Sequence, residues 1–320
     1  MSELRVGIIG CGRMGRERAR CVSSLGHVVH TVFDVDDERC RELAAQYGAH
    51  SVIRLEDCFR ADLDAIFICT APGTRGTVEI KCIQQALPIF VEKPIGISAT
   101  GCEELLLKLE QRPVVNAVGY MNRYRASVLL AQEILRESNI LGFSAQWVCK
   151  RYNVSWWQDE RTSGGPHNDQ ATHLFDLGRF LIGEVAEVQS LFVSPSRVAT
   201  LFRFEGHALG TAFYSCEGSE KDIGMRIFTT QGSLALEGWD FRIIANSVDG
   251  RLADNDGQDV FLEETSAFLG AVRSGNQDAI ACSFADAAKT QRVLDAARRS
   301  SQILHSIVVE PVVRSLLYEA

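Results

Sequence analysis

The chain has 320 residues, more than a single hydrophobic core usually supports, so two domains are expected. Its net charge of -8, with basic residues scattered along the chain, argues against nucleic-acid binding. The sequence enters a strand-like run at once, without a charged and apolar leader, and no apolar stretch is long enough to cross a bilayer. We therefore expect a cytoplasmic protein that binds neither nucleic acid nor a membrane.

The ten cysteines are scattered and form no Cys-x-x-Cys pair. Several lie inside apolar runs, as Cys69 does at the end of the run that begins at Ala65. Such positions are typical of small buried side chains kept reduced. We expect no disulfide framework and no zinc or redox site among them.

The first strand-like run, Leu4 to Ile9, opens directly into the pattern Gly-x-Gly-x-x-Gly. In a dinucleotide fingerprint the first glycine permits a tight turn, the second lets backbone N–H groups approach a pyrophosphate, and the third allows close helix packing. The phosphates then lie at the positive end of the following helix. The residues expected to contact a dinucleotide here are Gly10, Gly12, Arg13, Met14 and Gly15.

A second strand-like run, Val28 to Phe33, ends in Asp34, nineteen residues after the last glycine of that pattern. This fold places there a carboxylate that accepts hydrogen bonds from the adenosine ribose. Such a carboxylate repels the extra phosphate of NADP, so NAD is the expected cofactor and NADP the alternative. The competing interpretation is that Asp36 or Asp37 caps the helix ending at Tyr47 and that Asp34 is only held in the same turn.

The first 120 residues alternate strand-like and helix-like segments, which predicts a doubly wound parallel sheet. After an acidic helix at Glu56 to Arg60 comes a buried strand, Ala65 to Cys69, whose end at Thr70 lies on the edge where this architecture binds ligands. A further buried strand, Ile89 to Val91, ends in Glu92-Lys93-Pro94. A helix at Ser98 to Leu109 and a strand at Val114 to Val118 complete the unit.

Beyond Gly119 the pattern changes. We expect a helix from Tyr124 to Glu137, a strand near Phe143, an aromatic loop at Tyr152 to Trp157 and a helix from Pro166 to Leu181. A series of short strand-like runs follows. Strands in succession predict an antiparallel sheet. Two helices, Phe261 to Arg273 and Phe284 to Ser301, and a strand-like run at Ile303 to Val309 end the chain.

Lys93 lies at the carboxyl end of a central strand, near the expected nicotinamide. A lysine there can give a proton to, or take one from, an oxygen that changes between alcohol and ketone. The alternative is an ordinary exposed lysine at a strand end.

An aspartate and a histidine later in the chain favour a catalytic role for Lys93. Asp169 and His173 are four residues apart on the helix predicted from Pro166, so they share one face. With Lys93 from the other domain they can form a proton-transfer set for hydride transfer. The alternatives are a buried structural His173, and a metal site that adds His167. We expect no metal, because His167 and Asp169 diverge on one helix.

These motifs together resemble the glucose-fructose oxidoreductase and inositol dehydrogenase family, also written GFO/IDH/MocA. The resemblance covers essentially the whole chain in order, through Gly7 to Gly15, Glu92-Lys93-Pro94, Gly119 to Tyr124, and the Gly-Gly segment with Asp169 and His173. It implies a Rossmann domain at residues 1–120. It also implies a substrate-binding α+β domain at residues 121–320, whose open, largely antiparallel sheet mediates homodimers or homotetramers and whose last helices can pack back on the first domain.

The same resemblance implies reversible oxidation of a secondary hydroxyl on a sugar, cyclitol or related polyol. By motif position Lys93 matches the family's catalytic lysine, His173 its acid-base histidine and Asp169 the third member of the triad. Glu92 and Lys93 match contacts to the nicotinamide ribose, and Arg123 matches a residue lining the cleft.

The segment before the catalytic helix departs from the family by being more polar, which makes His167 or Asn168 a candidate substrate contact or helix cap. In the preceding loop, Trp156 and Trp157 are candidates to stack on a sugar ring or to serve packing. Two other functions remain open: a glycosidase that uses bound NAD through a transient ketone, and a non-enzymatic NAD(P)-binding regulator.

Overall fold

The structure is a computed structural model that describes residues 3–59 and 62–310. It divides into two compact units. Unit 1 comprises residues 1–96, 100–121 and 259–286, and unit 2 comprises residues 97–99, 122–258 and 287–320. Within the described ranges, no helix is long and apolar enough to cross a membrane.

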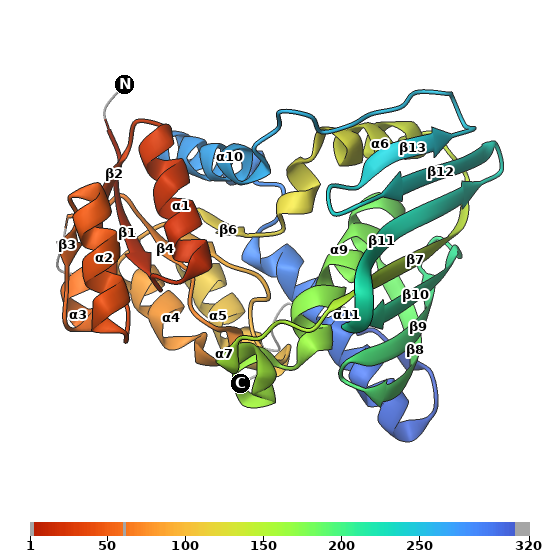
Figure 1. Cartoon of the computed structure of the whole chain (residues 1–320), viewed down its shortest axis with the longest axis horizontal. Coiled ribbons are helices and arrows are strands. Elements are labelled where there is room, and N and C mark those ends of the chain that lie inside the picture. The colour runs from red at the N-terminus through yellow and green to blue at the C-terminus, as the bar shows by residue number, and fades with distance from the viewer. Residues whose placement is uncertain (1–2, 60–61, 311–320) are drawn as a thin grey trace. The chain divides into compact units, whose positions relative to one another are not determined.

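Unit 1 contains a six-stranded, entirely parallel sheet in the order β3-β2-β1-β4-β5-β6, the strand order of the Rossmann fold. The strands, seen in Figure 1, are β1 (Arg5–Ile9), β2 (Val28–Phe33), β3 (His50–Ser51), β4 (Ala65–Ile68), β5 (Ile89–Val91) and β6 (Asn116–Val118). The three central strands β1, β4 and β5 are almost wholly buried, as expected for parallel strands covered on both faces. The predicted parallel sheet is confirmed.

The helices of unit 1 alternate with these strands. They are α1 (Arg13–Ser24), α2 (Asp37–Tyr47), α3 (Leu55–Cys58), α4 (Thr77–Gln84), α5 (Thr100–Gln111) and the later α10 (Val260–Ser274), with short 3-10 turns at Pro72–Thr74 and Gln277–Ala279. The acidic helix expected at Glu56 to Arg60 is α3, and Arg60 itself lies outside the described residues.

Helix α10 belongs to unit 1 although it comes late in the chain. Phe268 is fully buried and its ring lies 5.2 Å from that of Phe67 and 5.5 Å from that of Phe90, both in central strands. Burial of apolar surface against the parallel sheet therefore favours the packing of residues 259–286 in unit 1. The expected domains were two continuous segments, residues 1–120 and 121–320, whereas each of the observed units is assembled from several segments.

Unit 2 contains an eight-stranded sheet in the order β13-β12-β11-β7-β10-β9-β8-β14. Neighbouring strands are antiparallel except β7 and β10, which are parallel, so the predicted largely antiparallel sheet is confirmed. The strands are β7 (Ile140–Lys150), β8 (Val185–Ser194), β9 (Arg197–Phe204), β10 (Leu209–Ser215), β11 (Glu217–Thr229), β12 (Gly232–Glu237), β13 (Arg242–Asn246) and β14 (Ile307–Val308).

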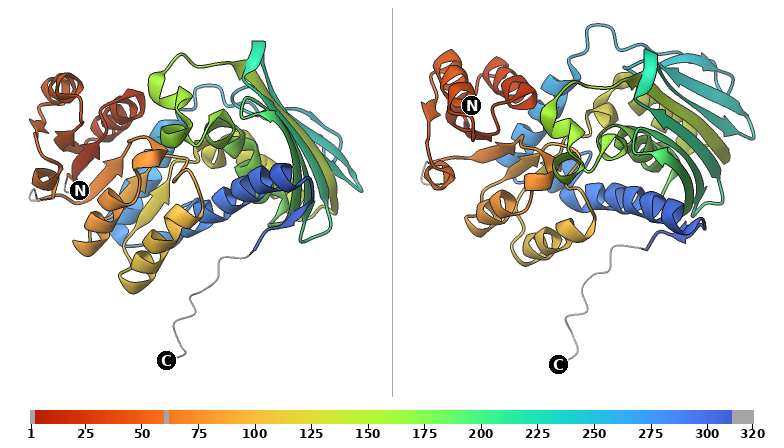
Figure 2. Two further views of the ribbon diagram at one scale, coloured as in Figure 1. Left: turned by 90° about the horizontal axis from the view of Figure 1, so that it is seen from below. Right: turned by 60° about the horizontal axis from the view of Figure 1, so that its bottom comes forward.

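One face of this sheet is covered by helices, and Figure 2 shows the other face bare. The helices that contribute to the core are α6 (Ala126–Arg136), α9 (Thr172–Ile182) and α11 (Phe284–Ile303). Strand β9 alternates strictly between exposed and buried residues, the pattern of a sheet with one solvent face. The aromatic loop was expected at Tyr152 to Trp157, and the short helix α7 (Ser155–Gln158) begins inside it. A second short helix, α8 (Glu160–Ser163), follows.

Candidate active site

The glycine turn after β1 has the geometry of a phosphate-binding loop. Gly10 has φ +97°, and a Cβ there would lie 2.7 Å from the carbonyl carbon of Cys69, so only glycine fits. A Cβ on Gly15 would overlap the carbonyl oxygen of Gly10, which shows how closely α1 approaches β1. Around Gly12, by contrast, a Cβ would meet nothing within 4 Å, and no side chain caps the N-terminus of α1. Its backbone N–H groups thus fit a dinucleotide pyrophosphate.

The carboxylate of Asp34 is hydrogen-bonded to the backbone of this turn. It accepts hydrogen bonds from the backbone N–H of Cys11 at 2.6 Å and of Asp36 at 2.9 Å. Asp36, not Asp34, caps helix α2, because its side chain accepts from the N–H groups of Glu38 and Arg39. The capping role is therefore filled separately, and Asp34 fits the ribose-binding position beside the phosphate loop.

The carboxyl ends of β4 and β5 are tied together by Arg75, which sequence reasoning did not identify. Its guanidinium donates to the carbonyl oxygens of Ile68 at 2.8 Å and Glu92 at 2.9 Å. Half-buried Lys93 follows at once. At the end of β4, the hydroxyl of Thr70 is buried without a hydrogen-bond partner among the described residues, so it is suited to bind a ligand at this edge.

The side chain of Glu92 lies in a buried ionic cluster of unit 1. It accepts from Nε of Arg18 at 2.8 Å, and the same guanidinium donates to Glu264 at 2.6 Å and lies 4.3 Å from the ring centre of Phe90. Burial alone would lower the pKa of Arg18, but the two carboxylates outweigh it and raise the pKa above the ordinary value. The carboxylate of Glu92 therefore anchors the Glu-Lys-Pro segment to α1 and α10.

In unit 2, Asp169 lies in a π-helical turn, His167–Ala171, and not in a regular α-helix as expected. Single π turns inside helices are frequent at functional sites. Asp169 is 8% exposed, and its Oδ2 accepts a hydrogen bond of 2.9 Å from Nε1 of Trp157. Trp157 is itself only 1% exposed. It therefore holds the carboxylate in place and does not offer its face to a ligand.

His173 is the second residue of α9, the helix that directly follows this turn, and is 4% exposed. Its ring stacks on buried Trp147, with centroids 5.2 Å apart and planes 11° from parallel. The edge of Trp239 lies near it at 6.5 Å, and this indole is 41% exposed. Nδ1 of His173 lies 3.5 Å from Nδ2 of Asn122. The imidazole is thus packed between aromatic rings and meets an amide.

Arg123 and His167, two other predicted substrate contacts, are buried and contact other side chains of unit 2. Arg123 is buried and forms a two-pronged ion pair with Asp176, at 2.9 and 2.7 Å. His167 is surrounded by the rings of Phe175, Phe192 and Tyr214, and burial, followed by the charge of Arg298, lowers its pKa to about 3. These contacts give both residues a structural part in unit 2.

Asn168, the remaining polar residue of this segment, is also buried and donates to the carbonyl oxygen of Ser163 while accepting from Gln291. Trp156, in contrast to its neighbour Trp157, keeps a 40% exposed side chain. Exposed aromatic side chains near the predicted site in unit 2 include Tyr152, Trp156 and Trp239, and sequence reasoning did not identify Trp239.

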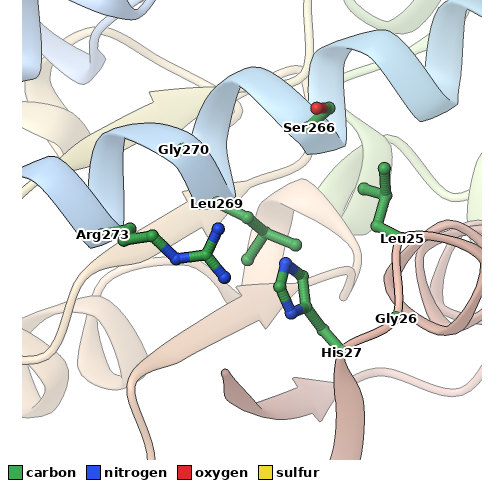
Figure 3. A pocket seen from close by; sticks show the side chains of 7 residues that line it. All are labelled: Leu25, Gly26, His27, Ser266, Leu269, Gly270 and Arg273. Carbon is green, nitrogen blue, oxygen red and sulfur yellow. The ribbon is translucent and has the colours of Figure 1, made fainter. Parts of the chain in front are cut away.

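A separate pocket of about 260 Å³ lies in unit 1 and is shown in Figure 3. It is lined by Leu25, Gly26, His27, Ser266, Leu269, Gly270 and Arg273. Burial and the charge of Arg273 lower the pKa of His27. Because His27 precedes β2, the pocket lies at the amino edge of the sheet, opposite the glycine turn, and is not the dinucleotide site.

Family models match both halves of the chain. A model described as "Oxidoreductase family, NAD-binding Rossmann fold" matches residues 4–120, and one described as "GFO/IDH/MocA C-terminal domain" matches residues 138–235. Together they cover more than half of the chain. The model that matches residues 4–120 describes an NAD-binding fold, which confirms NAD as the expected cofactor.

Among curated proteins, the chain is 23% identical to the myo-inositol 2-dehydrogenase of Thermotoga maritima, over 97% of this chain and 100% of that protein. It is 26% identical to the inositol 2-dehydrogenase of Burkholderia cenocepacia, over 62% and 60% of the two chains. Among solved structures, levoglucosan dehydrogenase in complex with NADH and L-sorbose shares the fold, with a TM-score of 0.88 at 19% identity over 97% of this chain and all of that one. UDP-N-acetylglucosamine 3-dehydrogenase from Acidithiobacillus ferrooxidans gives 0.85 at 20% identity, over 95% and 100%.

Proposed function

Because the chain belongs to the GFO/IDH/MocA family of NAD-binding oxidoreductases, we propose that it interconverts a secondary hydroxyl and a ketone on a sugar, cyclitol or related polyol. The observation that carries this proposal is the setting of Asp169 and His173, which are buried and held by hydrogen bonds and stacking in unit 2. Relatives named inositol and sugar dehydrogenases support the substrate class.

Lys93, Asp169 and His173 are the proposed acid-base set. When bound, NAD supplies the acceptor or donor of hydride at C4 of the nicotinamide. The protein binds the pyrophosphate at Gly10 to Gly15 and the adenosine ribose at Asp34, and it offers Thr70, Glu92 and Lys93 at the nicotinamide end. The acid-base set holds the substrate oxygen and moves its proton.

The direct test is the absorbance of the reduced nicotinamide during incubation of the protein with NAD or NADP and a panel of inositols, aldoses, amino sugars and nucleotide sugars. We expect one class to give NADH formation, or the corresponding ketone to consume NADH. Tight NADH binding without turnover on any alcohol or ketone would contradict the proposal and favour a regulator or an internal-redox glycosidase.

Asp34 is expected to set the preference for NAD. In Asp34→Ser the carboxylate is lost, so the Kd of NADH should rise about 10-fold or more, the value of one charge-assisted hydrogen bond, while that of NADPH should not rise. Fluorescence titration with both nucleotides measures this change. Asp37→Ser, on the exposed start of α2, is the matched control. Equal weakening of both nucleotides would show that Asp34 does not discriminate between them.

Trp157 is expected to act through Asp169. In Trp157→Phe the ring is kept but the Nε1–H that Asp169 accepts is removed. One hydrogen bond to a charged group contributes about 1.5 to 3 kcal/mol, so kcat should fall roughly 10- to 100-fold with KM little changed. Steady-state kinetics on the substrate found in the panel measures this fall. Trp156→Phe, an exposed neighbour, is the control, and equal effects in the two variants would assign Trp157 to packing alone.

We also propose that the bare face of the unit 2 sheet joins copies of this chain into a homodimer or homotetramer. Large apolar side chains stand exposed on its strands, and an apolar surface of this kind favours association. They are Leu191, Val193, Leu201, Leu209, Phe213 and Phe228.

Light scattering after gel filtration tests the assembly. Leu201→Glu, on this face, should lower the molecular mass toward that of a monomer. Val35→Glu, which replaces a residue 93% exposed in unit 1, should leave the mass unchanged. A monomeric starting protein would refute the proposed assembly.

The cytoplasm is the proposed compartment. All ten cysteines are free thiols, and nine of them are buried. Proteins of oxidising compartments typically carry disulfides, whereas reduced cysteines of this kind are usual in the cytosol. Fractionation of the source cells tests this location.

A further inference from the structure

We propose that Arg125 binds an anionic group of the substrate, a carboxylate or a phosphate, so that the protein acts on an acidic derivative of a sugar or cyclitol in preference to the neutral parent compound. All residues of this anion site belong to unit 2. Turnover of the bound molecule rests on the proposed function, whereas binding of the anion at Arg125 does not.

Arg125 differs from the other buried arginines in its partners. Within residues 3–59 and 62–310, three further arginines are buried, and each pairs with at least one carboxylate. They are Arg18, Arg123 and Arg179. Arg125 is 5% exposed and forms no ion pair with a carboxylate of these residues. Because the cost of burying a charge is normally offset by an opposite charge, this buried cation points to a counter-charge supplied by a ligand.

The contacts of Arg125 are with neutral oxygen atoms. Its Nε donates to Oδ1 of Asn122 at 2.8 Å, and its Nη2 donates to the carbonyl oxygen of Trp239 at 3.4 Å. The remaining nitrogen, Nη1, donates to no atom of the described part of the chain and is not among its enclosed unpartnered atoms. Donor capacity on the guanidinium is therefore left for a ligand.

The electrostatic surroundings of Arg125 disfavour a positive charge. Burial lowers the pKa of its guanidinium, and the carboxylate of Asp240 opposes this effect only in part. Asp240 is itself paired with Arg242, at 3.5 Å. Arg125 also stands at the N-cap of α6, where the positive end of the helix dipole adds to its charge. Arginine nevertheless stays protonated, so an anion that reaches it relieves an existing electrostatic cost.

The anion site lies beside the proposed acid-base histidine of the same unit. Asn122, whose oxygen accepts from Arg125, places its amide nitrogen 3.5 Å from Nδ1 of His173. Trp239, the second acceptor for Arg125, has its ring centre 6.5 Å from that of His173. One amide group thus separates the guanidinium from the imidazole. A hexose-sized molecule with a hydroxyl at His173 is therefore large enough to place an exocyclic group at Arg125.

A second cation extends the positive charge of this region. The ammonium of Lys221, on β11, lies 5.4 Å from the ring centre of Trp239. Lys221 is exposed, and it forms no ion pair within the described ranges. Arg125 and Lys221 therefore both contact Trp239, whose side chain is 41% exposed. An anion that approaches this indole meets two positive charges, from which a neutral polyol gains much less.

The chemistry of a guanidinium favours a carboxylate or a phosphate over a hydroxyl. Its planar fork of N–H donors matches two oxygen atoms of either anion, and such charge-assisted hydrogen bonds are about twice as strong as neutral ones. One hydrogen bond to a charged group is worth about 10- to 100-fold in affinity. An acid should therefore bind at least about 10-fold more tightly than the parent that carries a hydroxyl on the same carbon.

The first experiment compares compounds that share one ring. Isothermal titration calorimetry on the NADH-bound protein gives the Kd of glucose, glucuronate and glucose 6-phosphate, and of myo-inositol and its 1-phosphate. Saturation with NADH keeps the phosphates away from the glycine turn. We expect an acid to bind about 10-fold or more tightly than its neutral parent, and the acid that does so identifies the anionic group. Acids that bind no better than their parents in either series would overturn the proposal.

The second experiment assigns the preference to Arg125. Arg125→Met keeps much of the volume but loses the charge, so the preference of about 10- to 100-fold should disappear while the Kd of the neutral parent stays within about 2-fold. Arg136→Met, at the exposed C-terminal end of the same helix, is the matched control and should keep the preference. A preference that survives in Arg125→Met, or that disappears in Arg136→Met as well, would refute the assignment.

Urea unfolding tests, without any ligand, whether the charge of Arg125 serves the fold. All four tryptophans lie in unit 2, so their fluorescence follows that unit. Arg123→Met leaves Asp176, which is 1% exposed, without its cation and should lower the urea midpoint strongly. Arg125→Met leaves no carboxylate without its cation, so its midpoint should fall much less. Equal falls in the two variants would make Arg125 a structural cation and overturn the proposal.

The anion site and the proposed function fail separately. If an acid binds through Arg125 but neither it nor its ketone is turned over, the anion site stands and the dehydrogenase proposal is contradicted. If neutral polyols are turned over and their acids have no advantage in Kd or in kcat/KM, the dehydrogenase proposal stands and the anion site is refuted.

Discussion

Lys93→Ala is expected to lower turnover by about 10²- to 10⁴-fold, the usual contribution of a positioned proton-transfer group. The affinity for NADH should change by no more than a few-fold, because the pyrophosphate and the adenosine ribose are bound by the glycine turn and Asp34. Turnover on the substrate found in the panel and fluorescence titration with NADH measure the two quantities. Small primary amines in the buffer should restore part of the activity by replacing the lost amine.

The control for this experiment is Lys81→Ala. Lys81 lies in α4 of the same unit and pairs with Glu56 at the surface, at 2.8 Å. This variant loses the same charge but should keep both turnover and NADH binding. If Lys93→Ala instead loses NADH affinity as strongly as turnover, Lys93 is a cofactor ligand and the proton is moved by another group.

The glycine turn could be predicted from the sequence because its requirements are local. Gly10 needs a positive φ, and Gly15 needs the absence of a Cβ between α1 and β1, and both demands arise within six residues. The apolar runs of β4 and β5 are equally local, since strands buried on both faces need apolar residues throughout. Fold class and dinucleotide position therefore follow from short patterns.

The surroundings of the acid-base residues could not be predicted in this way. The indole that donates to Asp169 is twelve residues away in the chain. The amide that meets His173 and the carboxylate that pairs with Arg123 are 51 and 53 residues away. No spacing rule selects among the polar residues of such distant segments. The motif that contains Arg123 indicates a residue lining a cleft, and it does not indicate the buried ion pair that Arg123 forms with Asp176.

The π turn at residues 167–171 is a second feature that the sequence pattern did not predict. Side-chain periodicity predicts a helix but is nearly the same for α-helix and π-helix over one turn, so the sequence indicated a regular helix from Pro166. The place of residues 259–286 in unit 1 is a third feature that the sequence pattern did not predict. The amphipathic pattern of α10 indicates that one face is buried, but only the folded unit shows that Phe268 packs on Phe67 and Phe90.

Arg18→Met is expected to destabilise unit 1 by about 3 to 5 kcal/mol, the usual cost of removing one partner from a buried ionic cluster. Arg18 is fully buried and serves two carboxylates, those of Glu92 and Glu264, which are 5% and 1% exposed. Methionine fills much of the volume but supplies no positive charge. Two carboxylates would then remain in the protein interior without their cation, which is far less favourable than their hydration in the unfolded chain.

Arg20→Met is the matched control for this loss. Arg20 lies on the same helix, is 41% exposed at its side chain, and pairs with Glu17 and Asp259 at the surface, so its loss should cost less than about 1 kcal/mol. Urea unfolding followed by far-UV circular dichroism reports both units, whereas fluorescence of the four tryptophans reports only unit 2. The circular dichroism transition should move to lower urea in Arg18→Met alone. Equal shifts in both variants would mean that the cluster contributes no more than a surface ion pair, and that Glu92 and Lys93 are positioned by Arg75 and the strand ends instead.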